Sequence, residues 1–110
     1  MSGERTLSFM SHVDDAYNTS AGKAYIGDVV SRAKHDLAGD GKYEKLSADH
    51  QRIAMALTMA RQVLRDLANP HPSGLLTAYN GAAPDAARTF FQCSVDLVVD
   101  ANRLHQVKAH

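Results

Sequence analysis

Apolar residues recur every three or four positions along most of this chain, which is the spacing of one face of an α-helix. The first stripe predicts a helix over residues 5–18 and consists of Phe9, Met10, Val13, Ala16 and Tyr17. The second predicts a helix over residues 20–38 and consists of Gly22, Ile26, Val29, Val30, Ala33 and Leu37. Asn18, Thr19 and Ser20 supply capping side chains between the two, and Gly39 is the expected stop of the second helix.

The third stripe is the widest. It predicts a helix over residues 48–68, with Ser47 as its N-cap and Asp49 near the positive end of the helix dipole. Between Ile53 and Ala60 this helix is apolar on nearly every side. The polar residues that interrupt it are Thr58, Arg61, Gln62, Arg65 and Asp66. Such a helix is expected either at the centre of the protein, covered by its neighbours, or partly covered by another subunit or another protein.

The rest of the chain predicts a short helix and a long one. Two prolines after the third helix end it, and a short extra helix is expected near residues 74–80. Pro84 and Asp85 begin a last helix over residues 84–107. Its apolar face consists of Phe90, Phe91, Leu97, Val98, Ala101 and Leu104, with Val95 and Val99 beside that face.

These stripes predict an all-α protein, a compact antiparallel bundle of four main helices. No alternating run of apolar and polar residues indicates a strand. A chain of 110 residues is the size of one domain, so we expect a single helical domain over residues 1–110, with residues 1–4 as a flexible tail.

Composition indicates which classes of partner are disfavoured and where in the cell the protein is expected. Twelve Lys and Arg balance twelve Asp and Glu, so the bulk charge favours neither nucleic acid nor an anionic membrane. The single cysteine, Cys93, cannot form an internal disulfide, and no apolar run approaches the ~20 residues of a membrane span. The first residues lack the pattern of a secretory signal. We therefore expect a cytoplasmic protein that does not enter a membrane.

His12, the pair His35-Asp36, and Asp96 or Asp100 are the strongest candidates for chemistry. Their order resembles the ligand order of HD-domain metal-dependent phosphohydrolases. The resemblance implies that two His and two Asp bind a divalent metal that activates water against a phosphoester, so all four side chains must converge. An α-helix turns by ~100° per residue, which places His35 and Asp96 away from the apolar faces of their helices. We therefore expect both in solvent, with no bound metal or other cofactor.

Arg103 and His110 form a second candidate pair, separated by six residues. The pair resembles the ribonuclease motif of HEPN helical bundles, in which a histidine acts on RNA. A basic helix end that favours the dipole explains Arg103, His105 and Lys108 without any chemistry, and His110 lies where a helix frays. His105 falls near the centre of the apolar face of the last helix. Two interpretations stay open for it: a core-edge imidazole bonded to a carbonyl or a tyrosine, or a group that faces a ligand.

Arg52, Arg61 and Arg65 predict a basic strip along the third helix, which could bind a small anion or a nucleotide. Asp49 and Asp66 interleave with this strip, so an ordinary solvated face explains the same residues.

The apolar excess, together with the lack of a diagnostic catalytic motif, favours a small non-catalytic binding protein. We expect it to act on another protein as an adaptor, inhibitor or regulator, and to form a homodimer or another homo-oligomer. The candidate binding residues are Arg52, Arg61, Arg65 and His105. Two alternative functions stay open: a small-anion or nucleotide-binding protein, and an HD-like phosphohydrolase with metal ligands His12, His35, Asp36 and Asp100.

Overall fold

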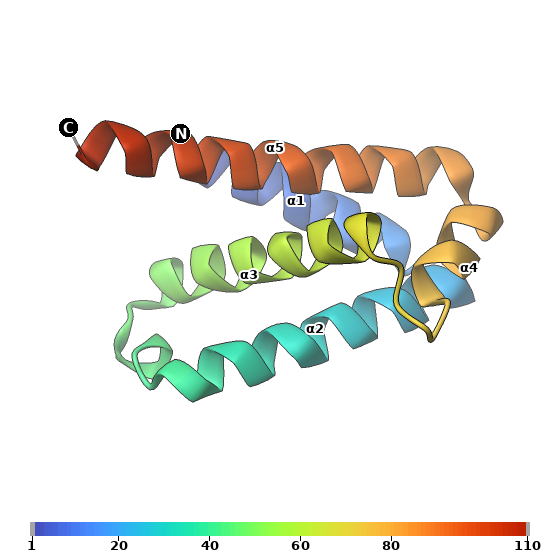
Figure 1. Ribbon diagram of the computed structural model, residues 1–110, viewed down its shortest axis with the longest axis horizontal. Coiled ribbons are helices and arrows are strands. Elements are labelled where there is room, and N and C mark those ends of the chain that lie inside the picture. The colour runs from blue at the N-terminus through green and yellow to red at the C-terminus, as the bar shows by residue number, and fades with distance from the viewer. Residues whose placement is uncertain (1, 110) are drawn as a thin grey trace.

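Five α-helices and one short 3-10 turn make up the computed structural model, which describes residues 2–109 of the chain (Figure 1). In chain order they are α1 (Ser2–Ala16), α2 (Ser20–Asp40), the 3-10 turn η1 (Tyr43–Lys45), α3 (Ala48–Ala68), α4 (Leu75–Ala82) and α5 (Pro84–Ala109). These described residues contain no strand, so the predicted all-α bundle is confirmed, and α4 is the predicted short extra helix. Within the same residues, no helix has the combined length and apolarity that crossing a membrane requires.

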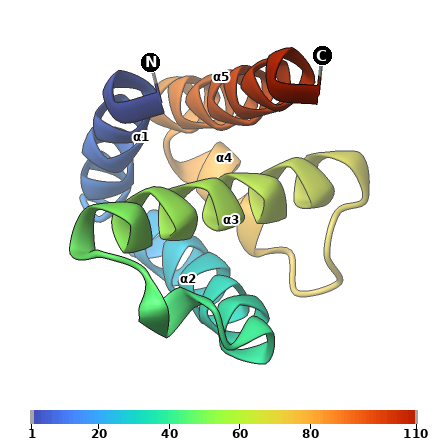
Figure 2. The same ribbon diagram turned by 90° about the vertical axis from the view of Figure 1, so that its left-hand side faces the viewer.

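α3 lies at the centre of the bundle. It packs against α2 on one side and against α1 and α5 on the other, while α4 closes one end next to α2 and α5 (Figure 1 and Figure 2). The apolar part of α3 is covered accordingly, since Ala56, Met59, Ala60 and Val63 are all buried. Of the two explanations for an apolar third helix, a central position therefore accounts for these residues.

Aromatic rings form the core where α1, α2, α4 and α5 meet. The ring centroids of Phe9 and Phe90 lie 5.4 Å apart, and Tyr79 of α4 places its ring edge-on to Phe90 at 6.4 Å. Tyr79 also stacks with Tyr25 of α2 at 6.2 Å. All four rings are buried, and aromatic pairs in such geometries add about 0.5–1.5 kcal/mol each beyond the burial of area. The short helix α4 therefore links α2 to α5.

Side-chain caps begin α2 and α3 at the residues that the sequence predicts. Thr19 Oγ1 accepts a hydrogen bond from the N–H of Gly22 at 2.9 Å. Ser47 Oγ accepts one from the N–H of His50 at 3.3 Å. Each hydroxyl satisfies one of the backbone donors that the first turn of a helix leaves free. These two starts are therefore fixed by local chemistry.

The end of α2 corrects the prediction that Gly39 stops this helix. Gly39 is helical, and α2 continues to Asp40. Gly41, with a φ of 73°, adopts the left-handed conformation that caps the helix. Glycine is tolerated inside a helix at a modest cost, so the helix runs on to the glycine that turns the chain.

α1 lies closer to the N-terminus than predicted. It begins at Ser2, three residues before the predicted start at residue 5, and it ends at Ala16. The N–H of Tyr17 then donates to the carbonyl of Asp14 at 3.1 Å in a tighter turn. Tyr17 consequently leaves the apolar face predicted for it, and 45 % of the residue is exposed.

The remaining boundary differences are small. α4 continues to Ala82, two residues past the predicted range of 74–80. α5 continues to Ala109 instead of ending near residue 107. The turn η1 was not predicted, because three residues are too few to carry a periodic pattern.

Candidate functional site

The histidines and carboxylates of the HD-like pattern lie on three different helices. His12 of α1 pairs within its own helix with Asp15, at 3.6 Å between Nδ1 and Oδ2. His35 and Asp36 lie on α2 and are exposed, as helical geometry predicts for His35. Among the described residues, no group of three or more His, Cys, Asp or Glu side chains could hold a metal ion. The structure therefore does not bring the four predicted ligands together.

Asp96 and Asp100 lie on α5, on the flank that faces α1. The side chain of Asp96 is 38 % exposed, and its Oδ2 lies 3.6 Å from Nη1 of Arg5 on α1. Its Oδ1 accepts a hydrogen bond from Nε2 of Gln92 at 3.0 Å. Asp100 Oδ2 is buried and has no hydrogen-bond partner in the described part of the chain. Asp96 therefore keeps contact with solvent, although Arg5 of α1 lies beside it.

Two predicted residues near the end of α5 lie outside what the structure describes. They are the side chain of His105 and the residue His110. Arg103 is exposed and lines a small hollow of about 120 Å³ together with Asp100. Both interpretations of His105 stay predictions.

The three arginines of the predicted basic strip do not share one face. Because an α-helix turns by ~100° per residue, Arg52 lies about half a turn around α3 from Arg61. Arg52 lines a hollow between α1 and α3, and its Nη1 lies 3.6 Å from Oδ1 of Asp49. Arg61 and Arg65 lie one helical turn apart and are exposed. The strip is therefore divided between two surfaces.

A buried polar network that the sequence analysis does not predict joins α2 to α3. The guanidinium of Arg32 donates two hydrogen bonds to Asp66, at 3.0 Å from Nη1 to Oδ1 and 2.6 Å from Nη2 to Oδ2. The hydroxyl of Tyr25 donates to Asp66 Oδ2 at 2.9 Å, and Asp28 Oδ2 lies 2.9 Å from Arg32 Nη2. Asp66 is only 3 % exposed, although its charge suggests a solvated position.

Gln62 extends this network toward the far end of α2. Its Oε1 accepts from Arg32 Nη1 at 3.5 Å, and its Nε2 donates to Oδ2 of Asp36 at 2.5 Å. On α2 the network residues Tyr25, Asp28, Arg32 and Asp36 are spaced by three or four positions. That polar stripe is the signal that could have revealed the network from the sequence, because it matches the spacing of Gln62 and Asp66 on α3.

The environment of the network keeps its donors protonated. Burial, reinforced by the charge and the hydrogen bond of Asp66, raises the pKa of the Tyr25 hydroxyl. The hydrogen bonds to Asp66 raise the pKa of Arg32 further above its already high ordinary value. Tyr25 and Arg32 therefore stay donors at physiological pH. Their hydrogen-bonding capacity serves to hold α2 against α3.

The largest hollow among those described lies between the C-terminal end of α3, α4 and the first half of α5. We call it the α3–α5 groove, and its volume is about 520 Å³. Four apolar side chains and three polar ones line it: Leu67, Leu76, Phe91, Val95, Asn80, Arg88 and Gln92. Leu67 of α3 is a large apolar residue, yet it is 40 % exposed. Val95, which the sequence places beside the main apolar face of its helix, forms part of the wall.

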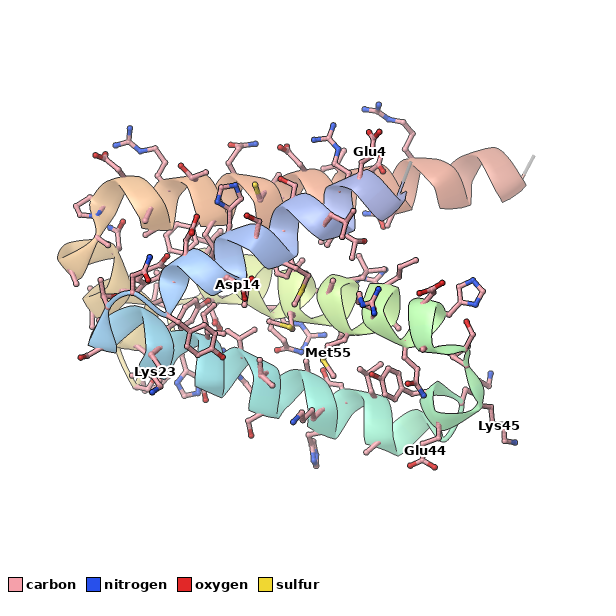
Figure 3. The ribbon with its side chains drawn as sticks, turned by 180° about the vertical axis from the view of Figure 1, so that it is seen from behind. Glu4, Asp14, Lys23, Glu44, Lys45 and Met55 are labelled. Atoms are coloured by element: carbon pink, nitrogen blue, oxygen red, sulfur yellow. The ribbon has the colours of Figure 1, made fainter. Side chains whose placement is uncertain are left out.

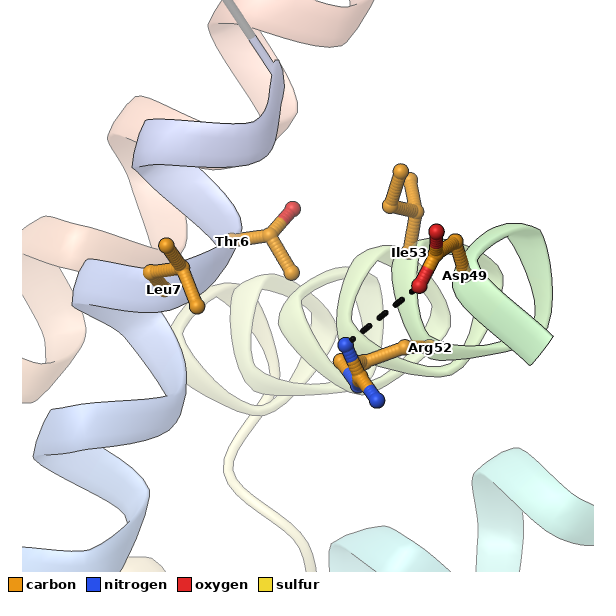
Figure 4. Close-up of a pocket in the computed structure, with 5 residues that line it drawn as sticks. All are labelled: Thr6, Leu7, Asp49, Arg52 and Ile53. Atoms are coloured by element: carbon orange, nitrogen blue, oxygen red, sulfur yellow. Dashed lines mark ion pairs between the residues drawn. The ribbon is translucent and has the colours of Figure 1, made fainter.

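A second hollow, the α1–α3 hollow, has a volume of about 260 Å³ (Figure 4). Its lining consists of Thr6, Leu7, Asp49, Arg52 and Ile53. Leu7 is 66 % exposed, which makes it the most exposed of the large apolar residues identified. Thr6 is 2 % exposed, and its buried Oγ1 has no hydrogen-bond partner among the described residues. Arg52 is the one predicted binding residue that this hollow contains.

A third hollow lies where α2, η1 and the first half of α3 meet, with a volume of about 300 Å³. Met55 of α3 points toward α2, and Glu44 belongs to η1 (Figure 3). Leu37, Ala38 and Tyr43 complete the apolar part of the lining. The hollow is shaped by the connection between two helices and brings no set of reactive groups together.

Comparison of the chain with protein-family models, with curated proteins and with solved structures finds no match.

Proposed function

We propose that this protein is a non-catalytic binding protein that docks a segment of another protein in the α3–α5 groove. One observation carries the proposal: Leu67 is 40 % exposed at the edge of a groove whose wall contains Leu76, Phe91 and Val95. Apolar side chains that water reaches gain about 25 cal/mol for each Å² that a partner covers. A ligand that fills the groove therefore gains most of its affinity by covering these apolar side chains.

The groove suits an amphipathic helix or a short apolar segment. Helix-lined grooves bind such segments through a few apolar anchors spaced along one face. The half-buried ring of Phe91 offers the kind of aromatic contact that dominates binding energy in many interfaces. Arg88 at the rim is exposed and forms no ion pair among the described residues, which favours a partner with a carboxylate nearby.

The polar interior supports a binding role over a catalytic one. Its buried carboxylate, Asp66, is paired with the half-buried guanidinium of Arg32 across two helices. Tyr25 and Gln62 complete their hydrogen bonds. A network of this kind stabilises a fixed shape, and a fixed shape is what a docking surface requires. Adaptor, inhibitor and regulator are the roles that fit such a protein.

A cytoplasmic location belongs to the same proposal. Cys93 is a free thiol, half-buried on α5, with the Ser8 hydroxyl 3.8 Å from its sulfur. Proteins of oxidising compartments commonly use cysteines in pairs, so a single half-buried thiol favours a reducing compartment. Fractionation of the producing cells, followed by immunodetection, tests the location.

The test compares two leucines of nearly equal exposure. Leu67 is 40 % exposed in the groove, and Leu46 is 39 % exposed at the end of η1. We expect a partner from the producing cells to be retained by the natural protein and by Leu46→Lys, but not by Leu67→Lys. With both proteins purified, calorimetry should give a 1:1 complex whose Kd rises about tenfold or more in Leu67→Lys. Equal binding by both variants would remove the groove from the proposal.

A further inference from the structure

We propose that the α1–α3 hollow is one half of a two-fold interface with a second copy of this chain. In this interface, Leu7 of each copy enters the hollow of the other, and Arg52 of each copy pairs with Asp49 of the other. The hollow shares no residue with the α3–α5 groove, so the two surfaces work independently. The inference therefore goes beyond the proposed function.

A projecting apolar side chain and a space that can receive it lie on the same patch. Leu7 is 66 % exposed on α1, and Ile53 of α3 is half-buried across the hollow from it (Figure 4). An interface with two-fold symmetry uses one patch twice, so this patch must carry both the projection and its receptor. The hollow, at about 260 Å³, is large enough for an aliphatic side chain and small for a whole helix.

The two charges at the rim of the hollow have opposite signs, so they can pair with the same two charges of an identical copy. Asp49 and Arg52 lie one helical turn apart, and their side chains are 87 % and 60 % exposed. Their separation within one chain is 3.6 Å, and such an exposed pair contributes little to stability, so both charges are available for exchange. A two-fold axis through the hollow brings each charge of one copy near the opposite charge of the other. If both rim residues carried the same sign of charge, a two-fold rotation would bring like charges together and the copies would repel.

The floor of the hollow is closed by the nearly buried side chain of Thr6. Thr6 is 2 % exposed, and its buried Oγ1 has no hydrogen-bond partner among the described residues. Figure 4 shows Thr6 extending from α1 toward α3.

A second copy fits this patch better than a small anion does. The positive charge of Arg52 is already offset by Asp49, so an anion gains no net attraction at the rim. The second copy uses both charges and also covers Leu7, which a small polar anion leaves in water.

Charge exchange provides the test. Sedimentation velocity over a wide concentration range should show association of the natural protein, with a dimer Kd at least ~tenfold weaker in Asp49→Arg and in Arg52→Asp. Each single variant places like charges together in its own dimer. The variant that carries both substitutions should regain association. An equimolar mixture of the two single variants should form a heterodimer, which native mass spectrometry distinguishes by mass.

Recovery in the double variant and in the mixture cannot arise from misfolding, so these two measurements isolate the proposed pairing. Arg61→Asp makes the same chemical change on an exposed face of α3 outside the hollow and should associate like the natural protein. Leu67→Lys should do the same, which separates this inference from the proposed docking function. A natural protein that stays monomeric at every concentration, or a mixture without heterodimer, would overturn the proposal.

Discussion

Arg32 of α2 and Asp66 of α3 form a bidentate ion pair inside the bundle, with N–O distances of 3.0 and 2.6 Å. The side chain of Asp66 is 5 % exposed, so its carboxylate depends on Arg32 and Tyr25 for the hydrogen bonds that water would otherwise supply. The cost of removing charges from water limits the net stability of such a pair. Its geometry still favours one alignment of the two helices, because a shift of either helix by one turn separates the partners.

Removal of the Asp66 carboxylate should be the most destabilising change in the network. We expect Asp66→Ala to lower the free energy of unfolding by about 3 kcal/mol, because Arg32 and Tyr25 lose their acceptor. This loss lies near the lower end of the range for breaking a buried ion pair, because Arg32 is 26 % exposed and its Nη2 still lies 2.9 Å from Oδ2 of Asp28. Urea unfolding followed by circular dichroism measures it. Asp14→Ala, an exposed change on α1, is the control and should alter stability by less than ~0.5 kcal/mol.

The raised pKa of Tyr25 predicts a loss of stability in alkali. The unfolded chain releases the tyrosine proton near pH ~10, whereas burial and Asp66 keep the folded Tyr25 protonated to higher pH. Stability from this group is therefore complete below pH ~10 and falls as the pH rises above it. Unfolding curves at neutral and alkaline pH should show a shallower fall in Tyr25→Phe. Part of the fall in stability should remain in this variant, because burial raises the pKa of Tyr79 as well.

At neutral pH the same variant should show only a small loss. We expect Tyr25→Phe to cost about 1 kcal/mol, because the Asp66 carboxylate keeps both bonds from Arg32. Tyr17→Phe removes a hydroxyl from a ring that is 45 % exposed and should leave stability unchanged. A fall of stability with pH that is identical in Tyr25→Phe and the natural protein would contradict the role given to burial here.

Substitution by alanine at Gly39 and at Gly41 should change the stability of the protein in opposite directions. Gly39 is helical and has open space where a Cβ would be, so Gly39→Ala should stabilise the protein by about 0.5–1 kcal/mol. Gly41 has a φ of 73°, which alanine adopts only with strain, so Gly41→Ala should destabilise by about 1 kcal/mol. Thermal unfolding of the pair checks both signs. The reverse order would mean that α2 ends at Gly39.

Gly22 marks the closest approach between the start of α2 and its neighbours. A Cβ there would overlap the carbonyl oxygen of Ala16 and lie 2.9 Å from Cε1 of Tyr79. We expect Gly22→Ala to cost about 2–3 kcal/mol, because backbone and a buried ring must both shift. Gly27→Ala, in the same helix with nothing near the added Cβ, should be neutral or stabilising. Equal effects in chemical denaturation would show that α1, α2 and α4 are less closely packed.

Local features of the fold follow from the sequence because their causes are local. The spacing of apolar residues predicts the main helices, and Thr19 and Ser47 cap α2 and α3 through backbone groups within three residues. The end of a helix is harder to predict where two nearby residues could each terminate it. Gly39 and Gly41 both suit a helix stop, and the chain uses the second.

The candidate sites were less predictable because they depend on pairs of helices. Asp66 and Gln62 look solvated on α3 alone, and only the approach of α2 shows that both are buried. Leu7 lies outside the predicted apolar stripe of its helix, and its exposure matters only beside α3. Of the predicted binding residues, Arg52 lines a hollow, whereas Arg61 and Arg65 lie on the exposed face of the same helix.

An all-α protein whose third helix is apolar enough to occupy the centre can be predicted from the sequence alone, since helical periodicity and caps act over a few residues. Which polar residues are buried and which apolar ones are exposed depends on how the helices pack together. The ion pair of Arg32 with Asp66 and the exposure of Leu67 both arise from the way helices distant in sequence meet. Periodicity within one helix identifies an apolar face but not the helix that covers it, because that choice depends on the packing of all the helices together.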